Sequence, residues 1–306
     1  MSTIKVKNIQ HPSAAEPAIV LNPDGSINVD INDLGASSLN GGGFGFRNKL
    51  INGSFDIWQR GSNFAAAGYT ADRWRGDANI AYTRVFGPDG LTYGMSLSAG
   101  TASIQQCIEL GLTGRAGEFY TGTTWTLSWY STTDTITPNV MFRDSSAPVS
   151  NDVSITVGSV SAVETVGSWT RYKAVVTIDQ SPAATNECLS VILITSGATS
   201  ISGIQLEKGG LTAFEQRFKG FELSLCQRYY FLRNSTIYIN RGYGEEGYLS
   251  WNWPTTMRKV PTVTVGNTSV IYAVSLSADI WGIKGYIKSD FSGTPAITTI
   301  EASAEF

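Results

Sequence analysis

The stretch ISGIQLEKGGLTAFEQRFKGFELSLCQRYY, residues 201–230, decides how the rest of the chain is organised. Its first part alternates apolar Ile204 and Leu206 with polar residues, which predicts a strand. Gly209 and Gly210 then allow backbone angles with positive φ and break that strand. From residue 218 onward the apolar spacing is mixed, so a short helical turn and a strand are both compatible with it. The stretch therefore closes one β-domain and opens another.

The composition favours an all-β protein. Only 15% of the 306 residues are charged, and 32 are glycine, a profile typical of many short strands and turns. The length suggests two domains, or a large β-domain and a small one. The net charge of −3 predicts no basic face for nucleic acid.

The sequence predicts neither a disulfide framework nor membrane insertion. Cys107, Cys188 and Cys226 are few, odd in number and widely spaced, so we expect three free thiols of a reducing compartment. The start MSTIKVKNIQ has no apolar core of a signal peptide, and no run approaches the roughly 18 apolar residues of a membrane span. A soluble protein, or one released by lysis, is expected.

Residues 46–226 are predicted to form the first β-domain, because strand patterns recur there at short spacing between Gly, Pro, Asn and Asp. On one of these strands Trp125, Leu127 and Trp129 share a face, and Thr126 and Ser128 share the other. The expected strands are 92–97, 102–108, 124–131, 139–142, 153–157, 170–178 and 189–194.

Residues 227–306 are predicted to form a second, smaller β-sandwich on the same grounds. Leu249, Trp251 and Trp253 alternate along one of its strands, so their shared face is expected to enter the core. The expected strands are 236–240, 247–253, 262–265, 270–274, 280–287 and 296–302.

Residues 1–45 are predicted to contain a hairpin and a linker. The apolar run 18–21, the turn Asn22-Pro23-Asp24-Gly25 and the alternating stretch 27–31 fit two paired strands. A lone hairpin is marginal in water, so this one needs another surface: its own chain, sister copies or a docking partner. A floppy tail is the alternative. The glycine-rich residues 35–45 fit a flexible linker better than a phosphate cradle, because no Gly-Lys-Ser/Thr follows.

Several motifs resemble those of bacteriophage tail-fibre and virion structural proteins. The first is QLE-x-G … FE-x-R … EL-x-L-C-Q-R-Y-Y, here Gln205 to Tyr230. The others are NGSFDIWQRG and ADRW near residues 52–74, a P-x-x-M-R-x-x-P-T-V element at 254–263, and the ending ASAEF. The opening, residues 5–14 and 21–26, resembles virion-attachment segments of such fibres.

The resemblance implies a jelly-roll β-sandwich like that of carbohydrate-binding modules, followed by a second β-sandwich. It also implies a non-enzymatic virion fibre, assembled in the host cytoplasm as a homotrimer. Residues 1–45 would attach the fibre to other virion proteins, and the β-domains would bind a host-surface glycan. A capsid-attached fibre or decoration protein is a close alternative, and a free carbohydrate-binding protein, unrelated to virions and monomeric, is another.

The chain contains few residues suited to catalysis. His11 is the sole histidine, and no cysteine has a close histidine or Cys-x-x-Cys partner, so we predict no catalytic residue, metal or cofactor. A virion-associated polysaccharide depolymerase would need two facing carboxylates, and a structural calcium at Asn52, Asp56 and Glu207 also stays open. The candidate carboxylates are Asp56, Asp72, Glu109, Glu118 and Glu207, each equally compatible with a salt bridge or a turn hydrogen bond.

Glycan binding is the favoured chemistry, because flat aromatic faces stack on sugar rings while polar neighbours contact hydroxyls. The richest aromatic cluster surrounds the glycine-rich loop 242–247. The predicted glycan-binding residues are Arg241, Tyr243, Glu245, Glu246 and Tyr248.

Overall fold

The structure is a computed structural model that describes residues 46–98, 100–144, 151–238, 246–267, 271–289 and 296–306, with three strands before them. These early strands are β1 (Asn8–Ile9), β2 (Ile19–Leu21) and β3 (Ile27–Val29). β2 and β3 pair antiparallel with Ile19 opposite Val29, which confirms the predicted hairpin, and β1 adds a third strand. The predicted linker 35–45 lies outside the described residues.

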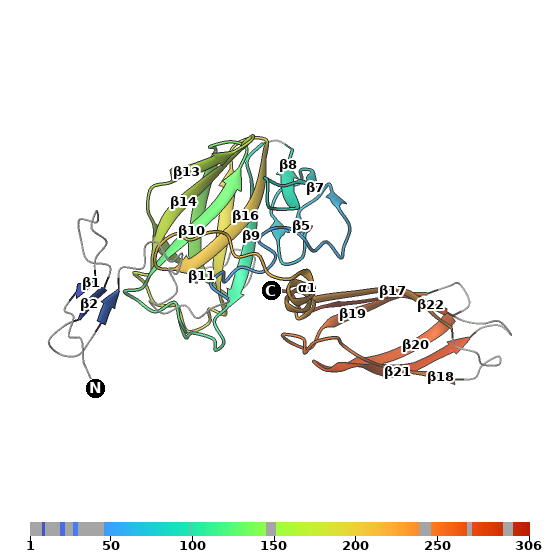
Figure 1. Cartoon of the computed structure of the whole chain (residues 1–306). Helices are drawn as coiled ribbons and strands as arrows, with labels where there is room; N and C mark the ends of the chain where they lie inside the picture. The colour runs from blue at the N-terminus through green and yellow to red at the C-terminus, as the bar shows by residue number, and fades with distance from the viewer. Residues whose placement is uncertain are drawn as a thin grey trace, which may run out of the picture.

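The first lobe is a two-layered antiparallel β-sandwich (Figure 1). One layer has the strand order β4-β7-β8-β16-β10-β14-β12, the other has β11-β15-β9-β6-β5, and β12 also pairs with β11 and so joins them. The strands are β4 (Asn63–Phe64), β5 (Gly68–Tyr69), β6 (Arg75–Gly76), β7 (Tyr82–Phe86), β8 (Tyr93–Leu97), β9 (Ala102–Glu109), β10 (Thr124–Ser131), β11 (Ile136–Arg143), β12 (Val153–Val157), β13 (Ser161–Val166, paired with β14), β14 (Trp169–Thr177), β15 (Cys188–Thr195) and β16 (Thr199–Lys208).

The core of this lobe follows the predicted alternation. Trp125, Leu127 and Trp129 on β10 are completely buried between the layers, as expected from their shared face. The opposite face of β10 is buried as well, because the connection after β16 covers it. Thr126 Oγ1 donates a hydrogen bond to the Gly209 carbonyl at 2.6 Å. The predicted all-β sandwich is therefore confirmed, with polar side chains filling a second, smaller covered surface.

The second lobe is a smaller sandwich of two three-stranded antiparallel sheets. One sheet has the order β17 (Tyr230–Tyr238), β22 (Ala296–Ser303), β19 (Thr262–Asn267); the other has β18 (Glu246–Asn252), β21 (Gly282–Ser289), β20 (Ile271–Ala278). Its core includes Phe231, Trp253 and Ile300. All six predicted strands overlap observed ones, and Trp253 is buried as predicted, while Trp251 is half-buried against this core.

The mixed apolar pattern after residue 218 resolves as a helix, α1 (Lys219–Gln227). Figure 1 shows α1 at the place where the two lobes meet. Glu222 and Cys226 are its buried residues, and the chain passes directly from its end into β17. Among the described residues, no helix has the length and apolar character that crossing a membrane requires.

Residues 48–53, which begin the first lobe, are held along β16; we call this contact the clasp. The Lys49 amide donates to the Leu206 carbonyl at 2.9 Å. The Asn48 side chain donates to the Ile204 carbonyl and accepts a hydrogen bond from the Leu206 amide. At Gly53 a Cβ would lie 2.1 Å from the Ile204 carbonyl oxygen, so only glycine permits this approach. The NG motif and the QLE motif are thus two sides of one contact.

Three charged side chains after β16 complete the clasp. Glu215 accepts a hydrogen bond from the Asn48 amide at 2.7 Å, and Glu222 on α1 accepts one from the Asn52 amide. The Arg217 guanidinium donates to the carbonyls of Asn48 and Leu50 and pairs with Glu222. The charged residues of the FE-x-R and EL-x-L motifs therefore provide hydrogen-bond partners for the backbone of residues 48–52.

The two lobes are joined by a second charged contact, which we call the seam. Arg73 of the first lobe and Glu305 of the second form an ion pair, and both side chains are almost completely buried. The Arg73 guanidinium lies 3.4 Å from the centre of the Tyr229 ring and donates to the Cys107 carbonyl at 2.5 Å. Burial is the largest single influence on the pKa of Arg73 and lowers it, but the Glu305 carboxylate, together with Tyr229, Tyr69 and Cys107, holds that pKa above its ordinary value.

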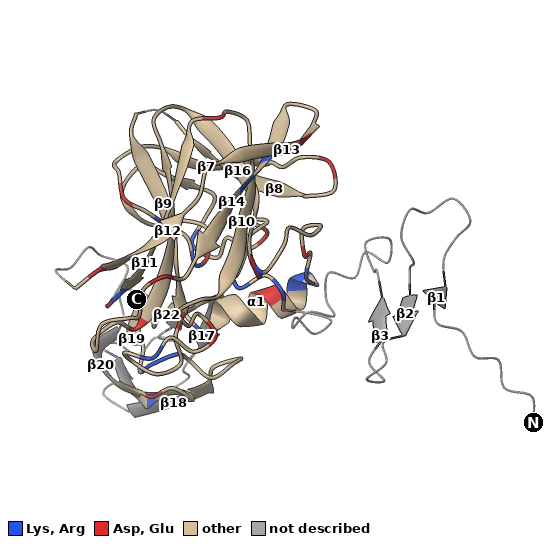
Figure 2. Cartoon of the chain, turned by 90° about the vertical axis from the view of Figure 1, so that its left-hand side faces the viewer, with Lys and Arg blue, Asp and Glu red and all other residues tan. Residues whose placement is uncertain are grey.

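The rest of the seam repeats this pattern of arginine on an aromatic ring. Arg60 lies over the Tyr230 ring at 3.4 Å and pairs with Glu305 at 3.4 Å. Arg258 of the second lobe lies 3.6 Å from the Phe306 ring centre. Figure 2 shows a blue and a red segment on α1 itself, which carries Lys219 and Glu222. A cation over a desolvated ring is worth about 2 kcal/mol, so these contacts favour the arrangement in which the two lobes meet at the seam.

Candidate functional site

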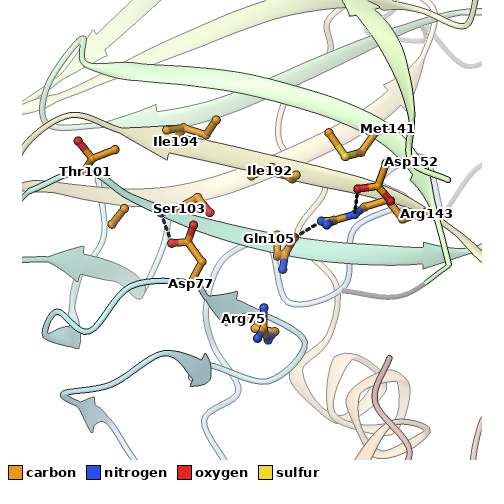
Figure 3. Close-up of a pocket in the computed structure, with 11 residues that line it drawn as sticks. Arg75, Asp77, Thr101, Ser103, Gln105, Met141, Arg143, Asp152, Ile192 and Ile194 are labelled. Carbon is orange, nitrogen blue, oxygen red and sulfur yellow. Dashed lines mark hydrogen bonds and ion pairs between the residues drawn. The ribbon is translucent and has the colours of Figure 1, made fainter. Parts of the chain in front are cut away.

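The outer face of the β11-β15-β9-β6 layer contains a groove of about 290 Å³ (Figure 3). Its lining is set by strand register: Arg75 on β6 lies opposite Gln105 on β9, which in turn lies opposite Ile192 on β15. The neighbouring pair of Ser103 and Ile194 lines the groove one step along. Each of these side chains points outward because its strand neighbours, such as Ile104, point into the core.

Polar groups in the groove are fixed by short contacts. Asp77 accepts a hydrogen bond from the Ser103 amide at 2.6 Å, which ties it to the start of β9. Arg143 donates to the Gln105 side-chain oxygen at 2.8 Å and pairs with Asp152 at 3.1 Å. Figure 3 shows Asp152, Arg143 and Gln105 joined in a line on one side of the groove and Asp77 on the other. These groups are held in place before any ligand arrives.

One carboxylate oxygen in the groove has spare hydrogen-bonding capacity. Asp152 Oδ1 is buried and accepts no hydrogen bond from any described residue, while Oδ2 pairs with Arg143. A buried acceptor without a donor is costly, so a ligand hydroxyl that reached it would be favoured. Beside these polar groups the floor is apolar, formed by Met141, Ile192 and Ile194. The groove is thus amphipathic: a flat apolar base with fixed acceptors and donors at its edges.

Of the predicted glycan-binding residues, only Glu246 and Tyr248 are described, and both belong to β18 of the second lobe. Arg241, Tyr243 and Glu245 fall outside the described residues. Glu246 is the first residue of β18, paired with Lys288, rather than part of a loop. Tyr248 follows on the same strand and is 77% exposed. The structure therefore tests neither the loop nor its role, and the prediction for these residues stays a prediction.

The five candidate carboxylates do not converge; each has its own local partner. Asp56 accepts from Ser54, Glu118 pairs with Lys49 at 2.8 Å, and Glu207 accepts from the Thr212 amide. Glu109 pairs with Arg228 across the seam at 2.9 Å. These are the salt bridges and turn hydrogen bonds that the sequence left open as the alternative.

Asp72 also has a partner, but a different one from that suggested by its neighbours in the sequence. Its carboxylate lies 3.8 Å from Arg60 and accepts a hydrogen bond from the Gln59 amide at 3.0 Å. Neither adjacent arginine, Arg73 or Arg75, is its partner in any described ion pair. Burial raises the pKa of Asp72 above its usual value, although hydrogen bonds from Gln59 and the Arg60 charge oppose that rise.

The residues considered for calcium or thiol chemistry have structural roles. The Asn52 amide bonds the backbone of Ile57 and Asp72, and the carboxylate of Glu207 holds Thr212. Within the described ranges, no group of three His, Cys, Asp or Glu residues could hold a metal ion. All three cysteines are free, as predicted, and buried. Burial raises the pKa of the Cys226 thiol well above its ordinary value, which disfavours a thiolate nucleophile.

Sequence reasoning missed Asp77, Gln105, Arg143 and Asp152. The 102–108 strand was predicted, and its alternation of polar Ser103 and Gln105 with apolar neighbours was a usable signal for a polar face turned away from the apolar core. Arg143 and Asp152, however, reach that face from distant segments. Only the pairing register of β11, β15 and β9 brings them together.

Comparison with known proteins gives weak similarity of structure and none of sequence. No protein-family model and no curated protein matches this chain. A structural match is the enzymatically active domain of tailspike protein 4 from bacteriophage CBA120, with TM-score 0.32, 15% identity, and coverage of 53% of this chain and 22% of that one.

A second match is a Clostridium thermocellum xylanase 10B fragment containing CBM22-1 and GH10 modules with xylohexaose, at TM-score 0.30 and 16% identity, covering 51% of this chain and 29% of that one. The chain thus spans less than a third of either protein's length. TM-scores this low carry no argument about function.

Proposed function

We propose that this chain is a non-enzymatic, fibre-type component of a phage virion that binds a host-surface glycan in the groove of its first lobe. The amphipathic groove is the observation that carries the proposal. A sugar ring has an apolar C–H face and a rim of hydroxyls, and the groove has an apolar floor beside Asp77, Gln105 and Asp152. Its volume of about 290 Å³ suits one or two sugar rings.

The seam supports the same function by making the two lobes one rigid body. A fibre that binds by several weak contacts gains affinity when the contacts are held at fixed spacing. Buried Arg73 and Glu305 fix that spacing at the joint. In the proposal, residues 1–45 attach the chain to other virion proteins and three copies assemble, so that each groove is presented three times.

Binding to purified host-envelope polysaccharide, measured by isothermal titration calorimetry, tests the groove. We expect Asp77→Asn and Asp152→Asn each to weaken binding by about tenfold, the effect of losing one charge-assisted hydrogen bond. The matched control is Asp179→Asn, an exposed carboxylate of the same lobe that bonds Thr156 outside the groove. Equal binding by all three variants and the unchanged chain would remove the groove from the proposal.

A glycan hydrolase is the second candidate, because two carboxylates, Asp77 and Asp152, line the same groove. Hydrolysis needs one carboxyl group as acid and another as base or nucleophile. Incubation with the same polysaccharide, followed by an assay for new reducing ends, separates the two functions. We expect no release. Release that Asp77→Asn or Asp152→Asn abolishes would make the protein a depolymerase.

Light scattering tests the assembly. We expect the full chain to have the mass of a trimer and a chain starting at Phe46 to have a lower mass. A monomer in both cases would exclude the trimer and, with it, the avidity that the fibre function uses. Low-resolution imaging of particles tests the location: the proposal expects the protein on the virion surface, attached through its first 45 residues.

Arg241, Tyr243 and Glu245, together with Glu246 at the start of β18, stay predicted glycan contacts. Tyr243→Ala on a glycan array tests them, and unchanged binding would remove the loop from the proposal.

A further inference from the structure

We propose that the outer face of the β18-β21-β20 sheet in the second lobe is a separate binding platform for an acidic saccharide. We call the exposed face around Tyr248, Tyr286, Lys284, Ser250 and Ser277 the tyrosine platform. The proposal rests on the glycan-binding function proposed above but places a second, chemically different contact on the other lobe. It also places that contact on a sheet rather than in a loop.

Strand register puts the platform residues side by side. Tyr248 on β18 lies directly opposite Tyr286 on β21, and Ser250 lies opposite Lys284 one step along. Ser277 on β20 lies on the other side of Lys284. Side chains directly opposite each other on one sheet face are about 5 Å apart at Cβ, so the five form one continuous surface.

Alternation of the strands turns this surface outward. Ile283, next to Lys284, is buried in the core of the lobe, and Trp251, next to Ser250, packs against that core. Their neighbours must point to the other face. Accordingly Ser250, Ser277 and Lys284 are exposed, Tyr286 is half-buried, and Tyr248 is 77% exposed. In Figure 1 this sheet is the lower layer of the second lobe, turned away from the first.

The chemistry of the platform fits a sugar ring. Tyrosine has an apolar ring face and a hydroxyl that can donate or accept, so adjacent Tyr248 and Tyr286 offer a stacking surface with polar edges. Tyr248 is 77% exposed, so most of its surface is open to a ligand. Ser250 and Ser277 add hydroxyl groups on the same sheet face, where they can hydrogen-bond to the sugar.

The charge of the platform selects an acidic sugar. Lys284 projects between two serines, and none of the ion pairs found among the described residues involves it. A lysine ammonium is a compact point charge that suits a single carboxylate or phosphate. The groove differs, because its arginines and aspartates, Arg75 and Arg143 with Asp77 and Asp152, balance in charge. We therefore assign an acidic saccharide to the platform and a neutral one to the groove.

The experiment compares three acidic polysaccharides, polygalacturonate, alginate and polysialic acid, with the same polymers after reduction of their carboxylates to alcohols. Dissociation constants are measured for the full chain. We expect at least one acidic polymer to bind at least tenfold more tightly than its reduced form. Tyr248→Ser combined with Tyr286→Ser should weaken binding to both forms tenfold or more. Lys284→Gln should abolish the preference for the acidic form while leaving binding to the reduced form unchanged.

The controls separate this proposal from the groove. Phe86→Ser removes an equally exposed aromatic from β7 of the first lobe and should change nothing. Asp77→Asn in the groove should leave acidic-polymer binding intact, and platform variants should leave groove binding intact. Far-ultraviolet circular dichroism checks that each variant folds. Failure to bind any acidic polymer, or an unchanged preference in Lys284→Gln, would overturn the platform without affecting the groove. If Phe86→Ser also weakened binding of the acidic polymers, that binding would be assigned to general surface hydrophobicity and not to the tyrosine platform.

Discussion

The seam and the groove are both built from arginine and carboxylate side chains, and they differ in what closes over those charges. In the seam, Arg73 lies against Glu305 and over the Tyr229 ring, and the two side chains are only 1% and 4% exposed. In the groove, Arg143 and Asp152 pair in the same way, but one oxygen of Asp152 still lacks a donor among the described residues. Arg73 Nε in the seam also lacks a hydrogen-bond partner among the described residues, so the difference lies in access. The Arg73 and Glu305 side chains are covered, whereas the Asp152 side chain is 19% exposed and lines the groove, where a ligand can approach it.

The residues that carry the resemblance to phage fibre proteins are separate from those that line the groove. The WQRG, ADRW, CQRYY and ASAEF motifs supply the seam, through Arg60, Arg73, Tyr229, Tyr230 and Glu305. None of the groove residues Asp77, Gln105, Arg143 and Asp152 belongs to those motifs. In this chain the motif residues thus hold the two lobes together, and other residues build the groove.

The largest expected effect comes from breaking the seam. Arg73→Met removes one partner of a buried ion pair and leaves Glu305 with only the more distant Arg60. Removing one member of a buried pair costs about 3–5 kcal/mol, because the remaining charge is uncompensated. Urea unfolding should show this loss in the free energy of unfolding.

The double variant Arg73→Met with Glu305→Met sharpens the test. Because both charges are then gone, we expect the double variant to be less destabilised than the sum of the two single variants. Additive losses would mean that the seam arginine acts through packing alone. A loss below about 1 kcal/mol for Arg73→Met would place this pair with ordinary surface salt bridges.

The next largest effect is expected at Asn52, where the clasp approaches the seam. Asn52 has φ of 58°, a left-handed conformation that asparagine tolerates better than most residues. Its side chain also bonds Ile57 and Asp72, and it is completely buried. Asn52→Ala removes these side-chain hydrogen bonds and places a residue that tolerates positive φ less well. We therefore expect a loss of about 3 kcal/mol in unfolding free energy.

Asn52→Gly is the matched control, because glycine accepts positive φ but lacks the amide. The difference in unfolding free energy between the two variants measures the backbone strain, and the loss in Asn52→Gly measures the hydrogen bonds. If Asn52→Gly matched the unchanged chain, the amide would have no part in stability.

The strands and their buried faces could be predicted from the sequence because they depend on local patterns. Trp125, Leu127 and Trp129 alternate in the sequence and are buried accordingly, and the early hairpin follows from its turn and its apolar period. It could not decide between helix and strand after residue 218, because α1 spans only nine residues with two buried side chains. Packing against the clasp, through Glu222, settled what the short pattern left open.

The site was harder to predict for a different physical reason. A strand shows which residues point outward, but not which strand becomes its neighbour. Gln105 and Ile192 meet because β9 pairs with β15, and Arg143 joins them through β11. The same limit applies to Asp72: its sequence neighbours suggested Arg73 or Arg75, whereas its observed partner is Arg60. Arg60 follows directly on Gln59, which lies thirteen residues from Asp72 and donates a hydrogen bond to it.

A smaller effect is expected from pH at Asp72. Burial raises the folded-state pKa of this acid above its unfolded value near 3.8, so the folded state binds a proton more tightly than the unfolded state. Its contribution is therefore present at low pH and is lost as pH rises through the folded pKa. Relative to Asp72→Asn, the unchanged chain should lose unfolding free energy as pH is raised from about 4 toward neutrality.

Asp179 is a control for which the change of stability with pH should have the opposite sign. A hydrogen bond from Thr156 lowers the pKa of this exposed acid, so its contribution is present above the unfolded pKa and is lost as pH falls. Against Asp179→Asn, the unchanged chain should gain relative stability as pH rises. Denaturant unfolding across the same pH series measures both, and a common sign for the two variants would contradict the burial of Asp72 as the cause.

The smallest effect is expected at an ion pair that matches the seam in distance but not in burial. Lys49 and Glu118 approach to 2.8 Å, yet the Lys49 side chain is 25% exposed and that of Glu118 46%. Exposed pairs contribute about 0–1 kcal/mol, because water already solvates both charges. Lys49→Gln should therefore change the unfolding free energy by less than about 1 kcal/mol. Adding 0.5 M salt should leave the effect of Arg73→Met in place while removing most of the Lys49→Gln effect, since salt screens exposed charges far more than buried ones. If instead Lys49→Gln cost as much as Arg73→Met, pairing distance rather than burial would be what makes the seam stable, and the contrast between a closed joint and an open groove would lose its physical basis.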